Sequence, residues 1–135
     1  MPSRNRVYVL ITAGPTREWL DPVRFLSNPS SGKMGYALAQ AAREAGATVT
    51  LVSGPVALAT PRGVELVRVE TAAEMAREVF RCAKRADVVI LSAAVADWAL
   101  VSQARQKLKK AEGGRQKAEC VLRLKATVDL SLIHI

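Results

Sequence analysis

A run of small polar residues opens directly into an alanine-rich helical pattern near residue 32. The letters SNPSSGKMG place Asn28, Ser30, Ser31 and Gly32 at this opening. Free backbone N–H groups and the helix dipole favour an anion such as phosphate at a helix start. Ser30 or Ser31 can equally be an ordinary N-cap. Asn28 fits a turn, and its amide could also donate to a developing oxyanion.

A second candidate is the basic loop that contains Lys107, Lys109 and Lys110. These lysines can be solvated surface charges, or they can form a lid that folds over a triphosphate. Between residues 101 and 125, eight Lys or Arg residues against two glutamates give +6 of the net charge of +8. Such a cluster suits phosphate groups. Because it lacks interleaved aromatic residues for stacking on bases, we expect a small anionic substrate rather than RNA.

Common cofactor motifs are absent from the sequence. Gly14 and Gly32 are too far apart for a dinucleotide-binding turn, and Lys33 is followed by Met34 rather than by Ser or Thr. His134 is the single histidine, which argues against a histidine-based metal site or catalytic triad. No metal-ligating residues are therefore predicted. The cysteines, Cys82 and Cys120, are expected to be reduced thiols.

The elements that must position these residues follow from the apolar patterns. Buried strands are expected over 6–14, 47–55, 63–70 and 87–97, and helices over 31–45 and 71–86. A piece at 118–130 alternates in polarity as an edge strand would. The strand and helix order predicts a three-layer α/β fold with a doubly wound, mainly parallel, Rossmann-like sheet of the ribokinase-like variant. No apolar run is long enough to span a bilayer.

Small or polar residues follow three of the expected strands. They are Gly14 after the first strand, the SGP at 53–55 after the second, and Ser92, Ala93, Ala94 and Asp97 at the end of the fourth. Ligands of such sheets bind beyond the carboxyl ends of the strands, so these residues are expected at one edge. Asp97 can be a turn cap there, or it can bind a ribose hydroxyl or a base edge.

Together these segments resemble a known family. The stretches ITAGPTREWLDPVRFLSNPSSGKMGYALA, VTLVSGP, SAAVADW and KLKK, in this order and spacing, are similar to the phosphopantothenate–cysteine ligase domain. In many bacteria that domain is the C-terminal half of a bifunctional coenzyme A biosynthesis flavoprotein. The resemblance extends over nearly the whole chain, from about residue 7 to residue 130.

The resemblance implies a reaction. The carboxylate of 4′-phosphopantothenate attacks the α-phosphate of CTP, and the amine of L-cysteine then attacks the acyl-cytidylate and releases CMP. Mg²⁺ accompanies the triphosphate. The resemblance further implies a cytoplasmic homodimer with no nucleic-acid or membrane partner and no flavin in this chain. A flavin-binding decarboxylase domain could belong to the same parent polypeptide.

Residue roles carried over by position are also implied by the resemblance. Asn28 would hold the acyl intermediate, with Ser30 near the same group, and Lys107 would serve the phosphates and the activation step. The remaining nucleotide-binding positions are Gly14, Ser31, Gly32, Ser92, Ala93, Ala94, Asp97 and Asp129.

The sequence departs from the family in two places. Where members carry Asn-Pro-Asp-Ile, this chain has TVDL and keeps only Asp129. The chain also ends six residues after Asp129, before further strands and a lysine-bearing loop found in members. We therefore expect residues 1–135 to be one truncated ligase domain with a basic loop at 98–119. A non-catalytic nucleotide- or phosphate-binding fragment and a basic RNA-binding domain are the alternatives, and the choice between CTP and ATP stays open.

Overall fold

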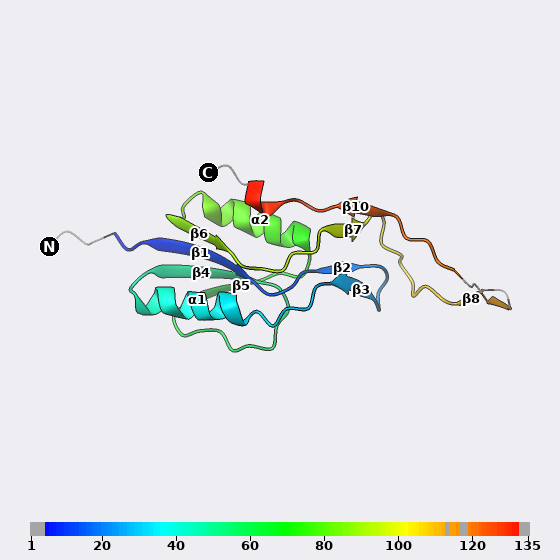
Figure 1. Cartoon of the computed structure of the whole chain (residues 1–135), viewed down its shortest axis with the longest axis horizontal. Helices are drawn as coiled ribbons and strands as arrows, with labels where there is room; N and C mark the ends of the chain where they lie inside the picture. The colour runs from blue at the N-terminus through cyan, green and yellow to red at the C-terminus, as the bar shows by residue number, and fades with distance from the viewer. Residues whose placement is uncertain (1–4, 113, 117–118, 133–135) are drawn as a thin grey trace.

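The body of the molecule is a four-stranded parallel sheet in the order β5-β4-β1-β6 (Figure 1). The computed structural model describes residues 5–112, 114–116 and 119–132. The strands are β1 Tyr8–Ala13, β4 Thr48–Ser53, β5 Glu65–Arg68 and β6 Val88–Leu91. The predicted α/β fold with a parallel sheet is confirmed, and the fourth strand is shorter than the expected 87–97.

One helix covers each face of the sheet, which gives three layers. Helix α1, Lys33–Glu44, packs on β1 and β4 over a core that includes Ile11, Tyr36 and Leu51. Helix α2, Ala72–Ala83, packs on the opposite face. Its buried stripe of Met75, Val79 and Cys82 is the one that helical spacing predicts. No helix in the described ranges is long and apolar enough to cross a membrane.

The segment between β1 and α1 forms a hairpin that the sequence does not predict. Its three prolines indicate an irregular connection, but β2 Arg17–Trp19 and β3 Phe25–Ser27 pair antiparallel. The hairpin is fixed to the start of α2 by three contacts. Glu18 Oε1 accepts a hydrogen bond from Ala72 N at 2.7 Å, Trp19 Nε1 donates to Glu70 Oε1 at 2.7 Å, and Arg17 N donates to Glu70 O at 2.7 Å.

A long excursion leaves the sheet after β6 and returns to it. It begins with β7 Trp98–Leu100 and ends with β10 Leu124–Ala126, which pair antiparallel with each other. The short strands β8 Ala111–Glu112 and β9 Arg115–Gln116 pair farther out, and the turn η1 Leu130–Leu132 brings the chain back against α2. We call residues 101–123 the arm (Figure 1). The expected edge strand at 118–130 thus shrinks to β10 and joins β7 instead of the main sheet.

Close packing of α1 on β1 predicts a severe effect of Gly35→Ala. A Cβ at Gly35 would lie 2.4 Å from Ala13 Cβ and 3.1 Å from Ala13 Cα, so that the helix must move away from the strand. We expect a loss of about 1–3 kcal/mol in the free energy of unfolding, measured by urea denaturation. Met34→Ala changes a neighbouring side chain that is 72% exposed and is expected to leave stability nearly unchanged. Equal stability of the two variants would contradict this packing.

Glu18 predicts a pH-dependent stability. Burial raises the pKa of this carboxyl above its ordinary value of 4.5, and the negative charge of Glu74 adds to this rise. The hydrogen bonds from Ala72 and Thr16 lower the pKa but do not cancel the effect of burial. The native state therefore favours the protonated acid, and this stabilisation is lost as the pH rises through the raised pKa. Glu18→Gln keeps a neutral acceptor for Ala72 N. Its stability relative to wild type should increase between about pH 4 and pH 7 in denaturation experiments. A constant difference across that range would contradict the prediction.

Candidate functional site

The site lies where the strand order reverses, between the carboxyl ends of β1 and β6. There, Ala94 N donates to Gly14 O at 2.9 Å, and Pro15 pairs with Ala94 in an isolated parallel bridge. Two hydroxyl groups, one on each side, also join residues 92–93 to Thr12 at the end of β1. Thr12 Oγ1 accepts from Ala93 N at 3.2 Å, and Ser92 Oγ donates to Thr12 O. The crevice at such a switch point is the usual ligand site of an open α/β sheet.

Asn28 joins the loop before α1 to this crevice. Its Nδ2 donates to Val95 O at 3.1 Å and lies 3.5 Å from Ala94 O. The second distance is at the outer limit of hydrogen bonding, so the contact with Ala94 O is the weaker of the two. The role of Asn28 stays a prediction, and the structure adds its attachment to the segment that contains Ala94.

The start of α1 is capped by Gly32 rather than by a serine. Gly32 has φ 77° and ψ 1°, and no side chain caps the helix. The alternative in which Ser30 or Ser31 is the N-cap is therefore wrong. Ser30 Oγ accepts from Gly32 N at 3.3 Å, and Ser31 Oγ accepts from Lys33 N at 3.4 Å. These long contacts shape the loop and leave the first helical turn open to an anion.

A cavity of about 410 Å³ opens on the α2 side of the same crevice. Thr12, Ala93 and Val95 line it from the sheet edge, and Trp98 and the segment 126–131 also line it. Thr127 closes the wall because its N–H donates to Asp97 O at 2.8 Å and its Oγ1 donates to Ala96 O at 2.6 Å. Thr127 stands where the sequence resemblance implies an asparagine, and its N–H and hydroxyl both bond to the segment that contains Ala96 and Asp97.

Acidic side chains line this cavity. Asp97 and Asp129 both line it. Hydrogen bonds from the Ser131 hydroxyl and N–H hold the pKa of Asp129 below its ordinary value of 3.8, so this carboxyl is ionised near neutral pH. Carboxylates suit sugar hydroxyls and base amino groups and repel phosphates. The charge of the cavity therefore suits hydroxyl and amino groups, whereas the open first turn of α1 suits an anion.

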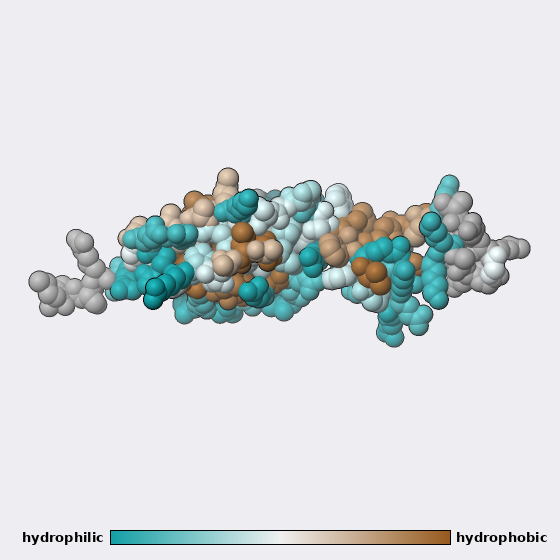
Figure 2. Space-filling view, turned by 90° about the horizontal axis from the view of Figure 1, so that it is seen from below, coloured by the Kyte–Doolittle hydropathy of each residue, from teal (hydrophilic) through white to brown (hydrophobic). Residues whose placement is uncertain are grey.

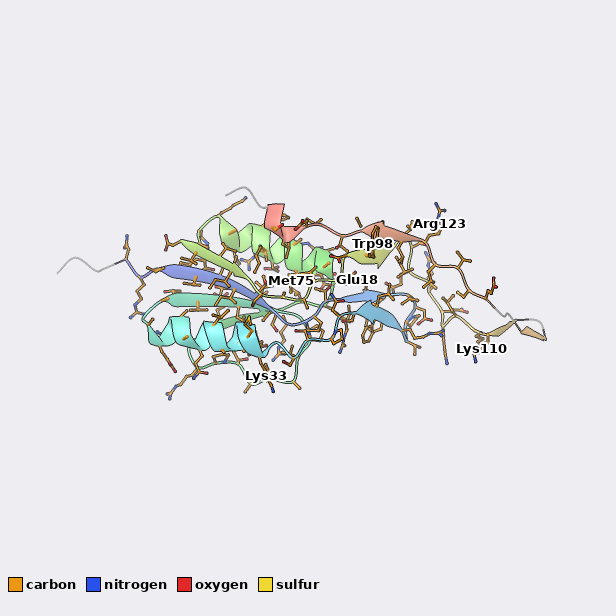
Figure 3. All side chains as sticks on the ribbon, viewed as in Figure 1. Glu18, Lys33, Met75, Trp98, Lys110 and Arg123 are labelled. Atoms are coloured by element: carbon orange, nitrogen blue, oxygen red, sulfur yellow. The ribbon has the colours of Figure 1, made fainter. Side chains whose placement is uncertain are left out.

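Lys107 does not lie with the other predicted site residues. Leu108, the next residue, bonds through its N–H to Asp21 in the turn between β2 and β3. Asn28 follows the opposite end of that hairpin, after the Arg17 and Ser27 pair. Figure 3 shows the same separation, with Lys110 far out on the arm and Lys33 at the start of α1. Within one chain, the predicted site residues other than Lys107 lie around the carboxyl ends of β1 and β6.

Buried threonines are the site residues that sequence reasoning overlooks. Thr16 is fully buried, and its Oγ1 accepts from Ala96 N at 2.9 Å. Together with Thr12 it fixes the backbone of the segment 92–97. The sequence does contain a sign of these residues, because the stretch ITAGPT places threonines in and just after an apolar strand. A buried hydroxyl there needs a hydrogen-bond partner.

Several expectations concern metals and thiols. Within the described ranges, no group of three His, Cys, Asp or Glu side chains could hold a metal ion. Cys82 is buried and Cys120 is exposed, and both are free. His134, Gly113 and Lys117 lie outside the described residues.

Exposed apolar side chains gather around the hairpin and the β7–β10 ribbon. Figure 2 shows this brown surface on the side seen from below. The exposed large apolar side chains in these elements and the adjoining arm are Val23, Phe25, Trp98, Val101, Leu108, Val121, Leu122 and Leu124. A surface of this kind marks an interaction site more often than a freely solvated face.

Comparison with known proteins agrees with this geometry. A family model for the DNA/pantothenate metabolism flavoprotein C-terminal domain matches residues 5–132. The coenzyme A biosynthesis bifunctional protein CoaBC of Vibrio vulnificus (strain YJ016) is 58% identical over 104 residues, which are 77% of this chain and 26% of that protein. The Bacillus subtilis CoaBC is 50% identical over 124 residues, 91% of this chain and 29% of that protein. The chain thus spans less than a third of either relative.

Solved structures show the same fold. The crystal structure of the C-terminal domain of CoaBC superposes with a TM-score of 0.77 at 46% identity, over 92% of this chain and 55% of that one. A DNA/pantothenate metabolism flavoprotein from Streptococcus pneumoniae superposes with a TM-score of 0.76 at 22% identity, over 91% of this chain and 61% of that one. The resemblance seen in the sequence is confirmed. This chain belongs to the family of DNA/pantothenate metabolism flavoprotein C-terminal domains.

Proposed function

We propose that this domain joins 4′-phosphopantothenate to L-cysteine at the expense of CTP, as a step of coenzyme A biosynthesis. The observation that carries the proposal is the position of Asn28, which is bonded to Val95 O between the open start of α1 and the acidic cavity. The relatives' role in coenzyme A biosynthesis supports it. A Cab2 mutant of the same fold has been solved in complex with phosphopantothenate-cysteine.

The chemistry proceeds in two transfers. A carboxylate oxygen of 4′-phosphopantothenate attacks the α-phosphorus of CTP, and the bond to the bridging oxygen breaks to release pyrophosphate. The cysteine amine then attacks the acyl carbon, and CMP leaves as the amide forms and the amine loses a proton. The Asn28 N–H that makes only a 3.5 Å contact with Ala94 O would turn to the oxygen that becomes negative in the second transfer, because an uncharged donor is most effective where charge develops.

The nucleotide is held in two parts. Asp97 and Asp129 receive the ribose and the base in the cavity, with Trp98 beside them. The phosphates extend toward Gly14, Gly32 and the serines before α1. Mg²⁺ would enter bound to the triphosphate, whose oxygens and water would supply its ligands, and it would neutralise phosphate charge there. Asp97 and Asp129 would not hold this ion, since they receive the ribose and the base.

Lys107 serves a second copy of the chain. In its own chain it lies at the end of the hairpin opposite Asn28. The exposed apolar side chains on the hairpin and the β7–β10 ribbon give two copies a surface on which to associate. A homodimer formed there would bring the arm of one chain to the sheet edge of its partner. This arrangement would place a lysine cation where pyrophosphate leaves, in a cytoplasmic enzyme supplied with CTP.

The ligase assignment predicts a defined product balance. With CTP, 4′-phosphopantothenate, L-cysteine and Mg²⁺, the chain should release pyrophosphate and CMP in equal amounts, measured by ³¹P NMR and chromatography. Parallel reactions with ATP decide the nucleotide preference. Calorimetric binding of CTP without pyrophosphate release would contradict the ligase assignment and support a fragment that binds nucleotide without catalysis. Salt-sensitive binding of single-stranded RNA without nucleotide preference would instead support the RNA-binding alternative.

Asn28→Asp tests the oxyanion role. The carboxylate has no N–H to donate, and it faces the carbonyls of Ala94 and Val95. We expect the rate of product formation to fall by about 10²–10³-fold. Gln40→Glu makes the same amide-to-acid change on the exposed face of α1 and should retain the rate. A rate for Asn28→Asp equal to that of this control would remove Asn28 from the mechanism.

A further inference from the structure

Asp21 is a fully buried carboxylate at the far end of the hairpin, outside the sheet-edge site. Its Oδ1 closes the turn locally, because it accepts from Val23 N and Arg24 N, both at 2.8 Å. An asparagine or aspartate commonly forms a turn of this kind with its own backbone. This local role accounts for one of the two carboxylate oxygens.

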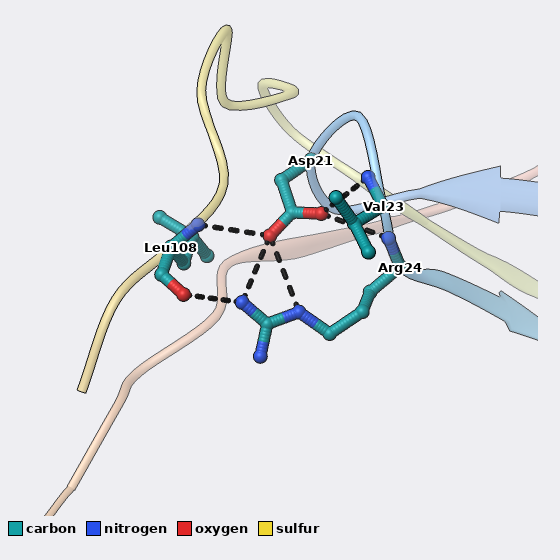
Figure 4. A network of polar contacts seen from close by, with 4 residues as sticks. All are labelled: Asp21, Val23, Arg24 and Leu108. Carbon is teal, nitrogen blue, oxygen red and sulfur yellow. Dashed lines mark hydrogen bonds and ion pairs between the residues drawn. The ribbon is translucent and has the colours of Figure 1, made fainter.

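The second oxygen binds the arm. Asp21 Oδ2 accepts from Leu108 N at 2.9 Å and from the Arg24 guanidinium, at 3.0 Å from Nη2 and 3.3 Å from Nε. Arg24 Nη2 also donates to Leu108 O, so the three residues close a ring (Figure 4). The ring holds the N–H and the C=O of Leu108, which belong to the peptide groups shared with Lys107 and Lys109. The residue between the two lysines is thus fixed through its backbone.

The hydrogen bonds to Asp21 favour its charged form. The hydrogen bond from Leu108 N–H, followed by those from Val23 and Arg24, holds the pKa of this carboxyl well below its ordinary value of 3.8, although burial opposes the shift. Asp21 is therefore ionised throughout the physiological range. A charged acceptor makes shorter and stronger hydrogen bonds than a neutral one, which favours a permanent hold on the arm.

The inner part of the arm has few other contacts with the body. Ala104 N donates to Leu20 O at 2.9 Å, again on the turn between β2 and β3, and Val101 N donates to Arg123 O at 2.9 Å within the arm. No helix or strand lies between β7 and β8, from residue 101 to residue 110. The lysine-bearing part of the arm is thus attached to the body through the turn between β2 and β3.

We propose that Asp21 is a positioning residue, which fixes the backbone of Leu108 so that Lys107 is presented to the triphosphate. This inference rests on the proposed role of Lys107. The proposal explains the second oxygen, Oδ2, because the turn of the hairpin needs only Oδ1.

Asp21→Asn separates the two functions of this side chain. The amide oxygen can still accept from Val23 N and Arg24 N, which preserves the turn. The amide NH₂ in place of Oδ2 cannot accept from Leu108 N or from Arg24. Arg24 is half exposed, so water can solvate the guanidinium that loses its partner. The variant should therefore fold and release only the arm.

The experiment combines hydrogen exchange with a double-mutant cycle on the complete chain. Exchange of the Leu108 amide is measured by mass spectrometry, and CTP affinity in the presence of Mg²⁺ is measured by calorimetry for wild type, Asp21→Asn, Lys107→Ala and the double variant. Glu78→Gln is the control, since it removes one carboxylate from an exposed ion pair on α2. Leu108→Pro removes the donor while leaving Asp21 intact, which keeps the test valid if Asp21→Asn does not fold.

We expect faster exchange at Leu108 in Asp21→Asn but not in Glu78→Gln. Affinity for CTP should fall about three- to tenfold in Asp21→Asn and in Leu108→Pro, the cost of ordering one or two long side chains on binding. The double variant should bind no more weakly than Lys107→Ala, because the carboxylate acts through that lysine.

Three outcomes would overturn the proposal. Unchanged exchange at Leu108 would show that Asp21 does not hold the arm. Additive losses in the double variant would show that Asp21 acts on the fold in general rather than through Lys107. Unchanged affinity in Lys107→Ala would remove the proposed role of the lysine itself, a failure that the exchange data distinguish from failure of the hold on the arm.

Discussion

The structure depends on the pairing of β1 on both of its edges. β1 pairs with β4 over Tyr8–Ala13 on one side and with β6 on the other. Because β1 lies at the centre of the sheet, the segment that follows β1 must pass between the ends of β4 and β6. The hydrogen bond from Ala94 N to Gly14 O fixes the position of this segment. The loop before α1, the acidic cavity and the hairpin are all arranged around that point.

The acidic and the basic side chains of this chain lie in different places. The cavity at the sheet edge carries Asp97 and Asp129, whereas the cluster of lysines lies out on the arm. A triphosphate needs cations near its leaving group, and the acidic cavity supplies none. Exposed Phe25 and Trp98 lie near the base of the arm, so association of two chains there would bring the two kinds of surface together.

Local patterns were sufficient to predict most of the sheet and both helices. The apolar run before Gly14 and the stripe of Met75, Val79 and Cys82 indicate their elements because burial follows the period of the backbone. The capping pattern at Thr71 predicts the start of α2, and Thr71 Oγ1 does accept from Glu74 N at 3.1 Å. Glu74 itself reaches Glu70 N instead of Thr71 N, a difference of one residue that spacing alone does not reveal.

The hairpin and the arm could not be predicted in the same way. β2 and β3 have three residues each, too few to show a period, and their pairing depends on contacts with α2 made by Glu18 and Trp19. Asp21 reads as a loop residue before a proline, and its partner Leu108 is distant in the sequence. The sheet-edge positions Asn28, Ala94 and Asp97 were predictable because strand order brings them together, but the location of Lys107 follows from these long-range bonds.

The proposed function requires that one active site use Asn28 from one chain and Lys107 from another. Mixing the separately inactive Asn28→Asp and Lys107→Ala proteins and measuring pyrophosphate release tests this requirement. We expect recovery of about a quarter of wild-type activity, because half of the randomly reassorted dimers are mixed and each mixed dimer has one intact site. If the mixture stays as inactive as its components while mixed dimers are shown to form, the two residues do not act across the interface.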